Sequence, residues 1–87
     1  MPDIRITTHY QRGTEAPYVV AHIPVPHGKD PQALVEELVE EYTPNLEEDF
    51  FEFISPATAR YSGKTTLIRS DLVIDVSFKV VNDVDQK

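Results

Sequence analysis

Apolar residues near both ends of the chain recur at every second position, in residues 3–11 and again in residues 72–80. Successive side chains of a β-strand point to opposite faces, so this period indicates half-buried strands. The two stretches are therefore predicted to be strands of an antiparallel sheet. The apolar positions are Ile4, Ile6, Thr8 and Tyr10 in the first stretch, and Leu72, Ile74, Val76, Phe78 and Val80 in the second.

A further strand is predicted over residues 18–25, joined to the first by the glycine-containing connection 12–16. Its apolar residues fall on both faces. Pro24 and Pro26 lack the backbone N–H of a sheet ladder, so the strand is expected to end there or to lie at a sheet edge. The two strands together form a predicted antiparallel hairpin.

One amphipathic helix is predicted in the middle of the chain. Asp30 and Pro31 begin it, because an Asp side chain can accept from the free N–H groups of the first turn and proline suits the first helical position. Thr43 and Pro44 end it, because a proline disfavours helical geometry in its predecessor. The apolar stripe consists of Leu34, Val35, Leu38, Val39 and Tyr42.

Residues 45–55 fit two structures, since their apolar spacing suits a helix while their aromatic residues favour a strand. We favour a short second helix that leads into an extended segment near Ser55 and Pro56. Residues 57–61 and 65–69 are predicted to form a hairpin around a turn at Gly63. Residues 69–71 form either a tight turn or a bulge within one long strand.

The predicted fold class is α+β, in the order β-β-α-(α)-β-β(-β). An antiparallel sheet of four to five strands carries one main helix on one face. Whether a short second helix packs there as well is left open. Residues 1–81 are expected to form a single domain. Residues 82–87 are expected to be a polar, frayed C-terminal tail.

The negative charge of the chain is concentrated in one segment. Residues 30–59 contain nine acidic residues and no Lys, Arg or His, so this segment carries −9. The flanking residues contain eight basic and six acidic residues, so they carry +2 and bring the formal net charge to −7. The chain is therefore a nearly neutral framework with an acidic insert.

The acidic residues of this segment are the candidate partner-binding site. Glu36 and Glu40, like Glu37 and Glu41, stand one helical turn apart, where like charges cost a few tenths of a kcal/mol. A solvated face that aids solubility is one interpretation, and an electrostatic docking surface is the other. The candidate residues are Glu36, Glu37, Glu40, Glu41, Glu47, Glu48, Asp49 and Glu52.

The favoured function is that of a small acidic, non-catalytic binding protein, regulatory or inhibitory, that engages a basic protein partner. The partner could itself bind nucleic acid, because carboxylates that repeat at about 5.4 Å along a helix can imitate a phosphate backbone. Small acidic proteins of bacterial viruses that block DNA-binding enzymes have a similar composition. Direct binding to nucleic acid is not expected, because no basic patch with interleaved aromatic residues is visible.

Two other functions stay open. The apolar residues on both faces of strand 18–25, with Val73 and Val81 on the polar side of the last strand, suggest an exposed sheet face. A homodimer partner or the second helix would cover that face. The alternative function is thus a structural assembly protein that works through sheet-face association, and the third is a small enzyme with a site at a dimer interface.

Specific chemistry finds little support in the sequence. Ser62-Gly63-Lys64-Thr65-Thr66 resembles a phosphate-binding loop, but it lacks the first glycine and precedes a predicted strand. His9, His22 and His27 have no metal-ligand spacing. No catalytic residue, metal site or cofactor is therefore predicted, and enzymatic activity is not favoured.

The composition also bears on the compartment. The chain has no cysteine, which excludes a disulfide framework and fits a reducing environment. No stretch approaches the roughly 20 apolar residues of a membrane-spanning helix, and no signal peptide is visible. A cytoplasmic location without membrane association is expected.

Overall fold

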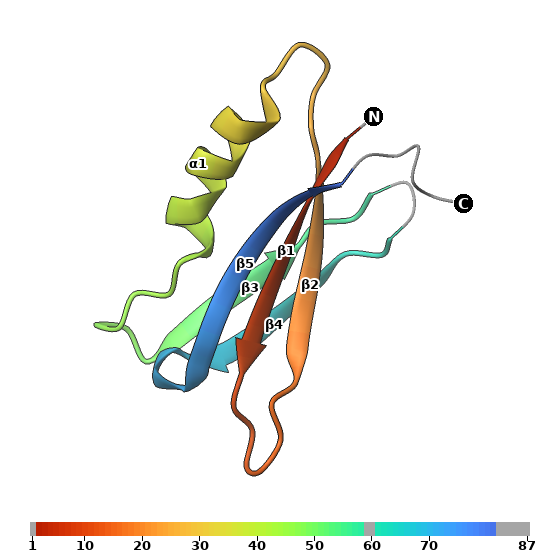
Figure 1. The fold of residues 1–87 in the computed structure, drawn as a ribbon. Coiled ribbons are helices and arrows are strands. Elements are labelled where there is room, and N and C mark those ends of the chain that lie inside the picture. Colours follow the sequence, from red (N-terminus) through yellow and green to blue (C-terminus); the bar gives the residue numbers. More distant parts are fainter. Residues whose placement is uncertain (1, 59–60, 82–87) are drawn as a thin grey trace.

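The computed structural model describes residues 2–58 and 61–81, and its elements follow the order β-β-α-β-β-β (Figure 1). A single turn of 3₁₀ helix precedes the last strand. The elements are β1 (Asp3–Tyr10), β2 (Tyr18–Pro24), α1 (Pro31–Tyr42), β3 (Phe50–Ser55), β4 (Lys64–Arg69), the 3₁₀ turn η1 (Ser70–Leu72) and β5 (Val73–Val81).

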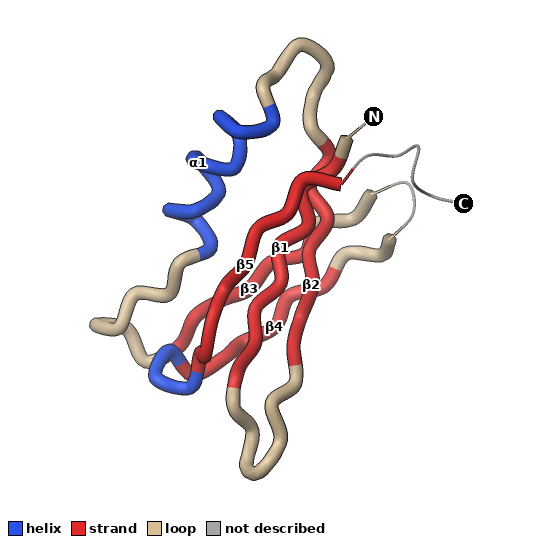
Figure 2. The backbone as a smooth tube through the Cα atoms, in the orientation of Figure 1, coloured by secondary structure: helices blue, strands red, loops and turns tan. Residues whose placement is uncertain are grey.

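The strands form two antiparallel sheets (Figure 2). One has the order β2-β1-β5, and the other is the hairpin β3-β4. The α+β class with one helix and antiparallel strands is confirmed, but the single sheet of four to five strands is wrong. The separation occurs at η1, where the buried Ser70 donates its N–H to the Asp49 carbonyl, 3.0 Å away, and the chain turns from β4 into β5.

The second helix predicted within residues 45–55 is also wrong, because residues 50–55 form β3. Phe51 and Phe53 are buried while the residues between and beside them are exposed, which is the period of a strand. Asn45 starts a turn before it: its side-chain carbonyl accepts from the Glu47 N–H at 3.0 Å. Antiparallel pairing with β4 stabilises residues 50–55 as a strand.

The partner of β4 is therefore β3, and not residues 57–61 as the sequence suggested. Phe51 lies opposite Ile68, and Ser55 lies opposite Lys64. Residues 59–60 and the predicted tail 82–87 lie outside the described residues.

The main helix is confirmed, with Asp30 as its N-cap residue and Thr43 as its C-cap residue. The Asp30 side chain makes no capping hydrogen bond, unlike the prediction. Leu38 and Tyr42 are buried, whereas Val39 is 40% exposed. No helix in the described part of the chain is long and apolar enough to cross a membrane.

The last strand was predicted to alternate without a break, but a β-bulge interrupts the alternation near its start. The β1–β5 register shifts between His9 and Tyr10, so that His9 pairs with Asp75 but Tyr10 pairs with Val73. The shift turns Val73 against the core and leaves Ile74 56% exposed. Val73 therefore does not add to an apolar outer face, although Val81 remains on it opposite Asp3.

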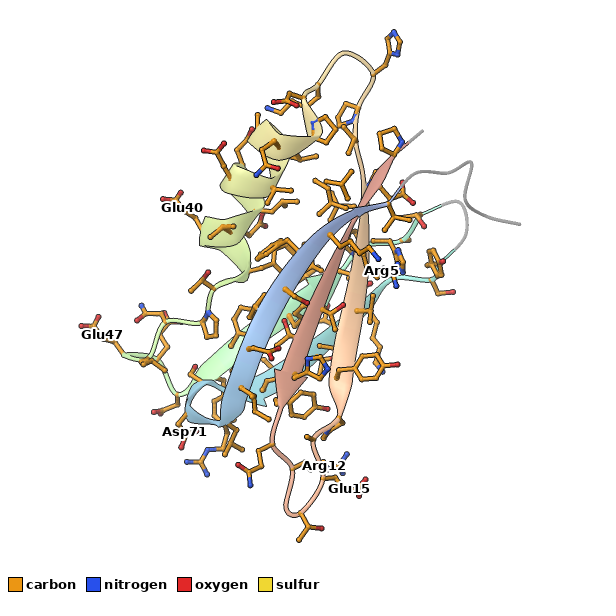
Figure 3. All side chains as sticks on the ribbon, in the orientation of Figure 1. Arg5, Arg12, Glu15, Glu40, Glu47 and Asp71 are labelled. Atoms are coloured by element: carbon orange, nitrogen blue, oxygen red, sulfur yellow. The ribbon has the colours of Figure 1, made fainter. Side chains whose placement is uncertain are left out.

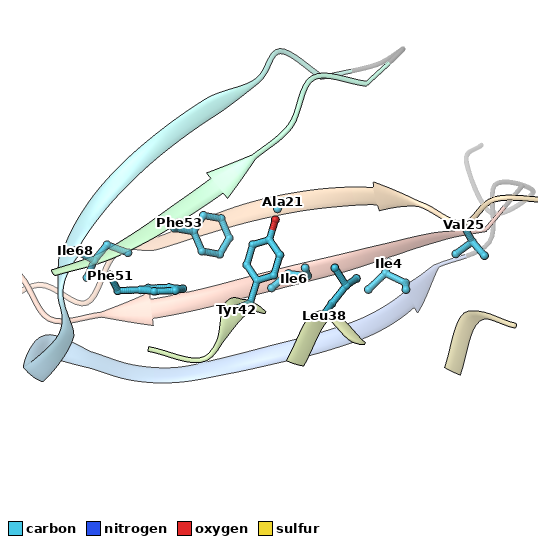
Figure 4. Close-up of a cluster of buried hydrophobic side chains, with 9 residues drawn as sticks. All are labelled: Ile4, Ile6, Ala21, Val25, Leu38, Tyr42, Phe51, Phe53 and Ile68. Atoms are coloured by element: carbon cyan, nitrogen blue, oxygen red, sulfur yellow. The ribbon is translucent and has the colours of Figure 1, made fainter. Parts of the chain in front are cut away.

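The core lies between two layers. One face of the three-stranded sheet, which we call the inner face, carries Ile4, Ile6 and Ala21. The second layer consists of α1 and the β3–β4 hairpin, which cover this face together (Figure 4). Tyr42 links the two parts of that layer, because its hydroxyl donates to the Ile54 carbonyl at 2.6 Å. The buried cluster comprises Ile4, Ile6, Ala21, Val25, Leu38, Tyr42, Phe51, Phe53 and Ile68.

Candidate interaction surface

All eight candidate acidic residues are exposed. Four lie on α1, three lie in the connection that follows it, and Glu52 lies on β3. Because α1 and β3–β4 both cover the inner face, their outward sides point away from the three-stranded sheet. Glu40 and Glu47 extend to the same side of the molecule in Figure 3. We call these eight residues the acidic surface: Glu36, Glu37, Glu40, Glu41, Glu47, Glu48, Asp49 and Glu52.

Few carboxylates of the acidic surface form ion pairs within the part of the chain that the structure describes. Among the described residues, Glu37 is the one member with an ion pair, to the Lys29 ammonium in the loop before α1. Glu40 and Glu41 lie in the last turn of the helix, next to the partly negative C-terminal carbonyl groups, and no basic residue lies in that turn. The arrangement of these carboxylates therefore opposes helix stability.

Exposed apolar side chains border the acidic surface, and the sequence interpretation missed them. Leu46 is 79% exposed in the connection, and Phe50 is 56% exposed at the start of β3. On the outward face of the hairpin, Leu67 is 66% exposed and lies directly opposite Glu52. Strand alternation in residues 50–55 was the available signal, because it places Phe50, Glu52 and Ile54 on one face.

A hollow of about 510 Å³ lies where the acidic and apolar side chains meet. Leu46 and Phe50 supply its large apolar side chains, and Glu48 and Asp49 supply carboxylates. Arg69 lies at this site as well, but its guanidinium donates to the Asp71 carboxylate at 3.1 Å. The hollow thus offers apolar contact together with carboxylates that have no ion pair within the described residues.

The opposite face of the three-stranded sheet, which we call the outer face, has a different character. Arg5 at its centre lies opposite His22 on β2 and opposite Lys79 on β5. The His22 ring stacks on Tyr61, with ring centroids 4.0 Å apart and an interplanar angle of 5°. In Figure 3, Arg5 lies on the other side of the molecule from Glu40 and Glu47. Arg5 and its neighbours on the outer face therefore lie apart from Glu40 and Glu47, whereas Lys29 and Arg69 lie beside the acidic surface.

No metal centre is found in the described residues, since none of their His, Asp and Glu side chains gather into groups of three or more that could hold an ion. His9 instead lies 2.9 Å from the Asp75 carboxylate, across the β1–β5 ladder. Comparison of the chain with protein-family models, with curated proteins and with solved structures finds no match.

Proposed function

We propose that this chain is a non-catalytic binding protein that engages a basic protein partner through the acidic surface and the adjoining apolar side chains. The observation that carries the proposal is the position of eight exposed carboxylates beside exposed Leu46, Phe50 and Leu67. A surface whose only role is solubility needs the charges but not these apolar neighbours.

The two kinds of side chain have separate roles in such binding. Carboxylates without an internal partner attract a basic surface over several ångströms and raise the association rate. Apolar side chains supply affinity once they lose water against a partner. The partner is therefore expected to present Lys or Arg around an apolar patch that fits the hollow at Leu46 and Phe50.

A regulatory or inhibitory role follows if the partner normally binds nucleic acid. The carboxylates of α1 stand one turn apart, about 5.4 Å along the helix axis, and Glu47 and Glu48 follow in the connection after the helix. Such a series can occupy a groove that receives phosphates. Competition by DNA or RNA for the captured partner distinguishes this role from ordinary charge-assisted docking.

The test is comparative capture from a cell lysate with three variants. Glu40→Lys/Glu41→Lys reverses two charges and relieves repulsion within α1, so the fold is expected to persist. Leu46→Ser/Leu67→Ser removes exposed apolar side chains and leaves the charge unchanged. Glu15→Lys reverses an exposed charge in the β1–β2 connection, away from Glu40 and Glu47 (Figure 3), and is the control.

The proposal expects one set of proteins, captured by the wild type and by Glu15→Lys, to be lost with both other variants. Loss with the charge variant alone would mean that nonspecific attraction of basic proteins explains the capture. Retention with both variants would contradict a role for this surface.

A further inference from the structure

The two edge strands of the three-stranded sheet, β2 and β5, have different surroundings. The edge at β2 borders a groove of about 400 Å³ that residues of β3 and β4 also line, and Tyr61 reaches across to stack on His22. Tyr61 is held in place because its carbonyl accepts from the Thr58 N–H at 2.9 Å. At the other edge, no strand within residues 2–58 and 61–81 pairs with the free side of β5.

β5 is a suitable strand for further pairing. It is the longest strand described, with nine residues, and most of them are β-branched or aromatic. Ile74 and Val80, near its two ends, are 56% and 38% exposed. A long apolar edge of this kind pairs readily with another strand unless charges prevent it.

The charges of β5 are complementary under a twofold rotation. If two copies of β5 pair antiparallel with Ser77 opposite Ser77, Asp75 of each copy lies opposite Lys79 of the other. Both side chains lie on the outer face, as the β1–β5 register requires. The same pairing places Val76 opposite Phe78.

Other twofold registers lack this complementarity. Centring the pair on Asp75 or on Lys79 brings like charges together, which destabilises a sheet. Centring it on Val76 or Phe78 leaves both charges without an opposite partner. The Lys79 ammonium has no ion pair among the described residues, and Asp75 uses one carboxylate oxygen for His9 and keeps the other.

We infer that the edge of β5 is a homodimer interface, in which two copies pair antiparallel about Ser77 and form a continuous six-stranded sheet. The occupant is a second copy of this chain, because β5 itself carries the complementary charges. The interface is isologous, so each Asp75–Lys79 ion pair occurs twice. The inference is independent of the acidic surface and differs from association through a sheet face.

The test uses charge exchange at the two positions, with mass measured by sedimentation equilibrium from low to high concentration. The wild type is expected to approach twice its 9.9 kDa mass as concentration rises. Lys79→Glu places a carboxylate opposite Asp75 of the second copy and is expected to raise the dissociation constant of the dimer about tenfold or more. Asp75→Lys is expected to do the same, because an introduced ammonium group then lies opposite Lys79.

Mixing the two single variants gives the decisive result. One chain then presents two carboxylates at these positions and the other presents two ammonium groups, so a heterodimer is expected where each variant alone is monomeric. Because the introduced glutamate also lies opposite Arg5 in its own chain, Lys79→Glu is expected to fold at least as well as the wild type. Glu15→Lys matches the net-charge change of Asp75→Lys, and Lys64→Glu, on the hairpin, matches that of Lys79→Glu; both are controls.

Three results would overturn the inference. One is a wild type that stays monomeric at the highest concentration reached. Another is a wild-type dimer whose dissociation constant does not change in Lys79→Glu. The last is a mixture of the two single variants that does not associate.

Discussion

Arg5 lies directly opposite Lys79 across the β1–β5 ladder, so two cationic side chains face each other on the outer face of the sheet. Like charges at directly opposed positions destabilise an antiparallel pair, whereas opposite charges stabilise it. The same Lys79 lies where a second copy of β5 would present a carboxylate. Arg5 and Lys79 therefore give the centre of the outer face a positive charge. Neither side chain has an ion pair among the described residues.

Lys79→Glu is predicted to raise the free energy of unfolding of the monomer. Replacing the repulsion from Arg5 with an attraction is expected to contribute between a few tenths and about 1 kcal/mol. Urea unfolding at low protein concentration measures the change, with Lys64→Glu, opposite Ser55 on the hairpin, as control. A lower midpoint for Lys79→Glu than for Lys64→Glu would contradict the register.

Thr8→Val is predicted to stabilise the protein. Thr8 is fully buried between Val19 and Val76 in the sheet, and its hydroxyl has no hydrogen-bond partner among the described residues. Removing an unsatisfied buried hydroxyl while keeping the side-chain shape is expected to add about 1 kcal/mol. Thr7→Val, on the outer face, is the control, and an equal effect at both positions would argue against the burial of Thr8.

Tyr42→Phe is predicted to cost about 1 kcal/mol, because it removes the hydrogen bond to the Ile54 carbonyl that links α1 to β3. Burial raises the pKa of the Tyr42 phenol above its ordinary value of 10.0, and the Glu41 carboxylate adds to the rise. The pKa of this phenol is thus higher in the folded protein than in the unfolded chain, so the unfolded chain loses the proton at a lower pH. The contribution of the Tyr42 hydroxyl to stability is therefore complete below pH 10 and is lost as the pH rises through the folded-state pKa.

The measurement is chemical unfolding of the wild type and of Tyr42→Phe on both sides of pH 10. The wild type is expected to lose more stability than the variant as the pH rises. Equal losses in the two proteins would mean that the Tyr42 hydroxyl lies in water.

Serine substitutions at Val73 and Ile74 test the β-bulge. Val73 packs against the core, so Val73→Ser is predicted to cost about 1 kcal/mol. Ile74 is exposed, so Ile74→Ser is predicted to cost less than about 0.5 kcal/mol in the monomer. Thermal unfolding at low concentration compares them, and the reverse order would mean that the strand alternates without a bulge.

Local patterns in the sequence predicted the elements that depend on neighbouring residues. Residues 3–11 and the helix after Asp30 were recognised because their burial repeats with the period of the structure they adopt. Residues 45–55 were misassigned because the apolar spacing around Phe50 and Phe53 suits both periods. Only the ladder with β4, which joins residues as far apart along the chain as Phe50 and Arg69, decides between them.

The bulge at Ile74 and the division into two sheets depend on contacts that local sequence does not encode. The turn at Ser70 sends β5 to β1 rather than to the hairpin, and nothing in residues 69–71 specifies that partner. The acidic surface could be named in advance, because charge is visible in the sequence. Its apolar neighbours Leu46 and Leu67 could not, because their exposure follows from the position of the hairpin.

The most direct test of the proposed function compares proteins captured from a lysate by the wild type, Glu40→Lys/Glu41→Lys, Leu46→Ser/Leu67→Ser and Glu15→Lys, quantified by mass spectrometry. The proposed function predicts that the same basic protein is retained by the wild type and by Glu15→Lys and is lost with the other two variants. Equal recovery of every captured protein with all four would contradict it.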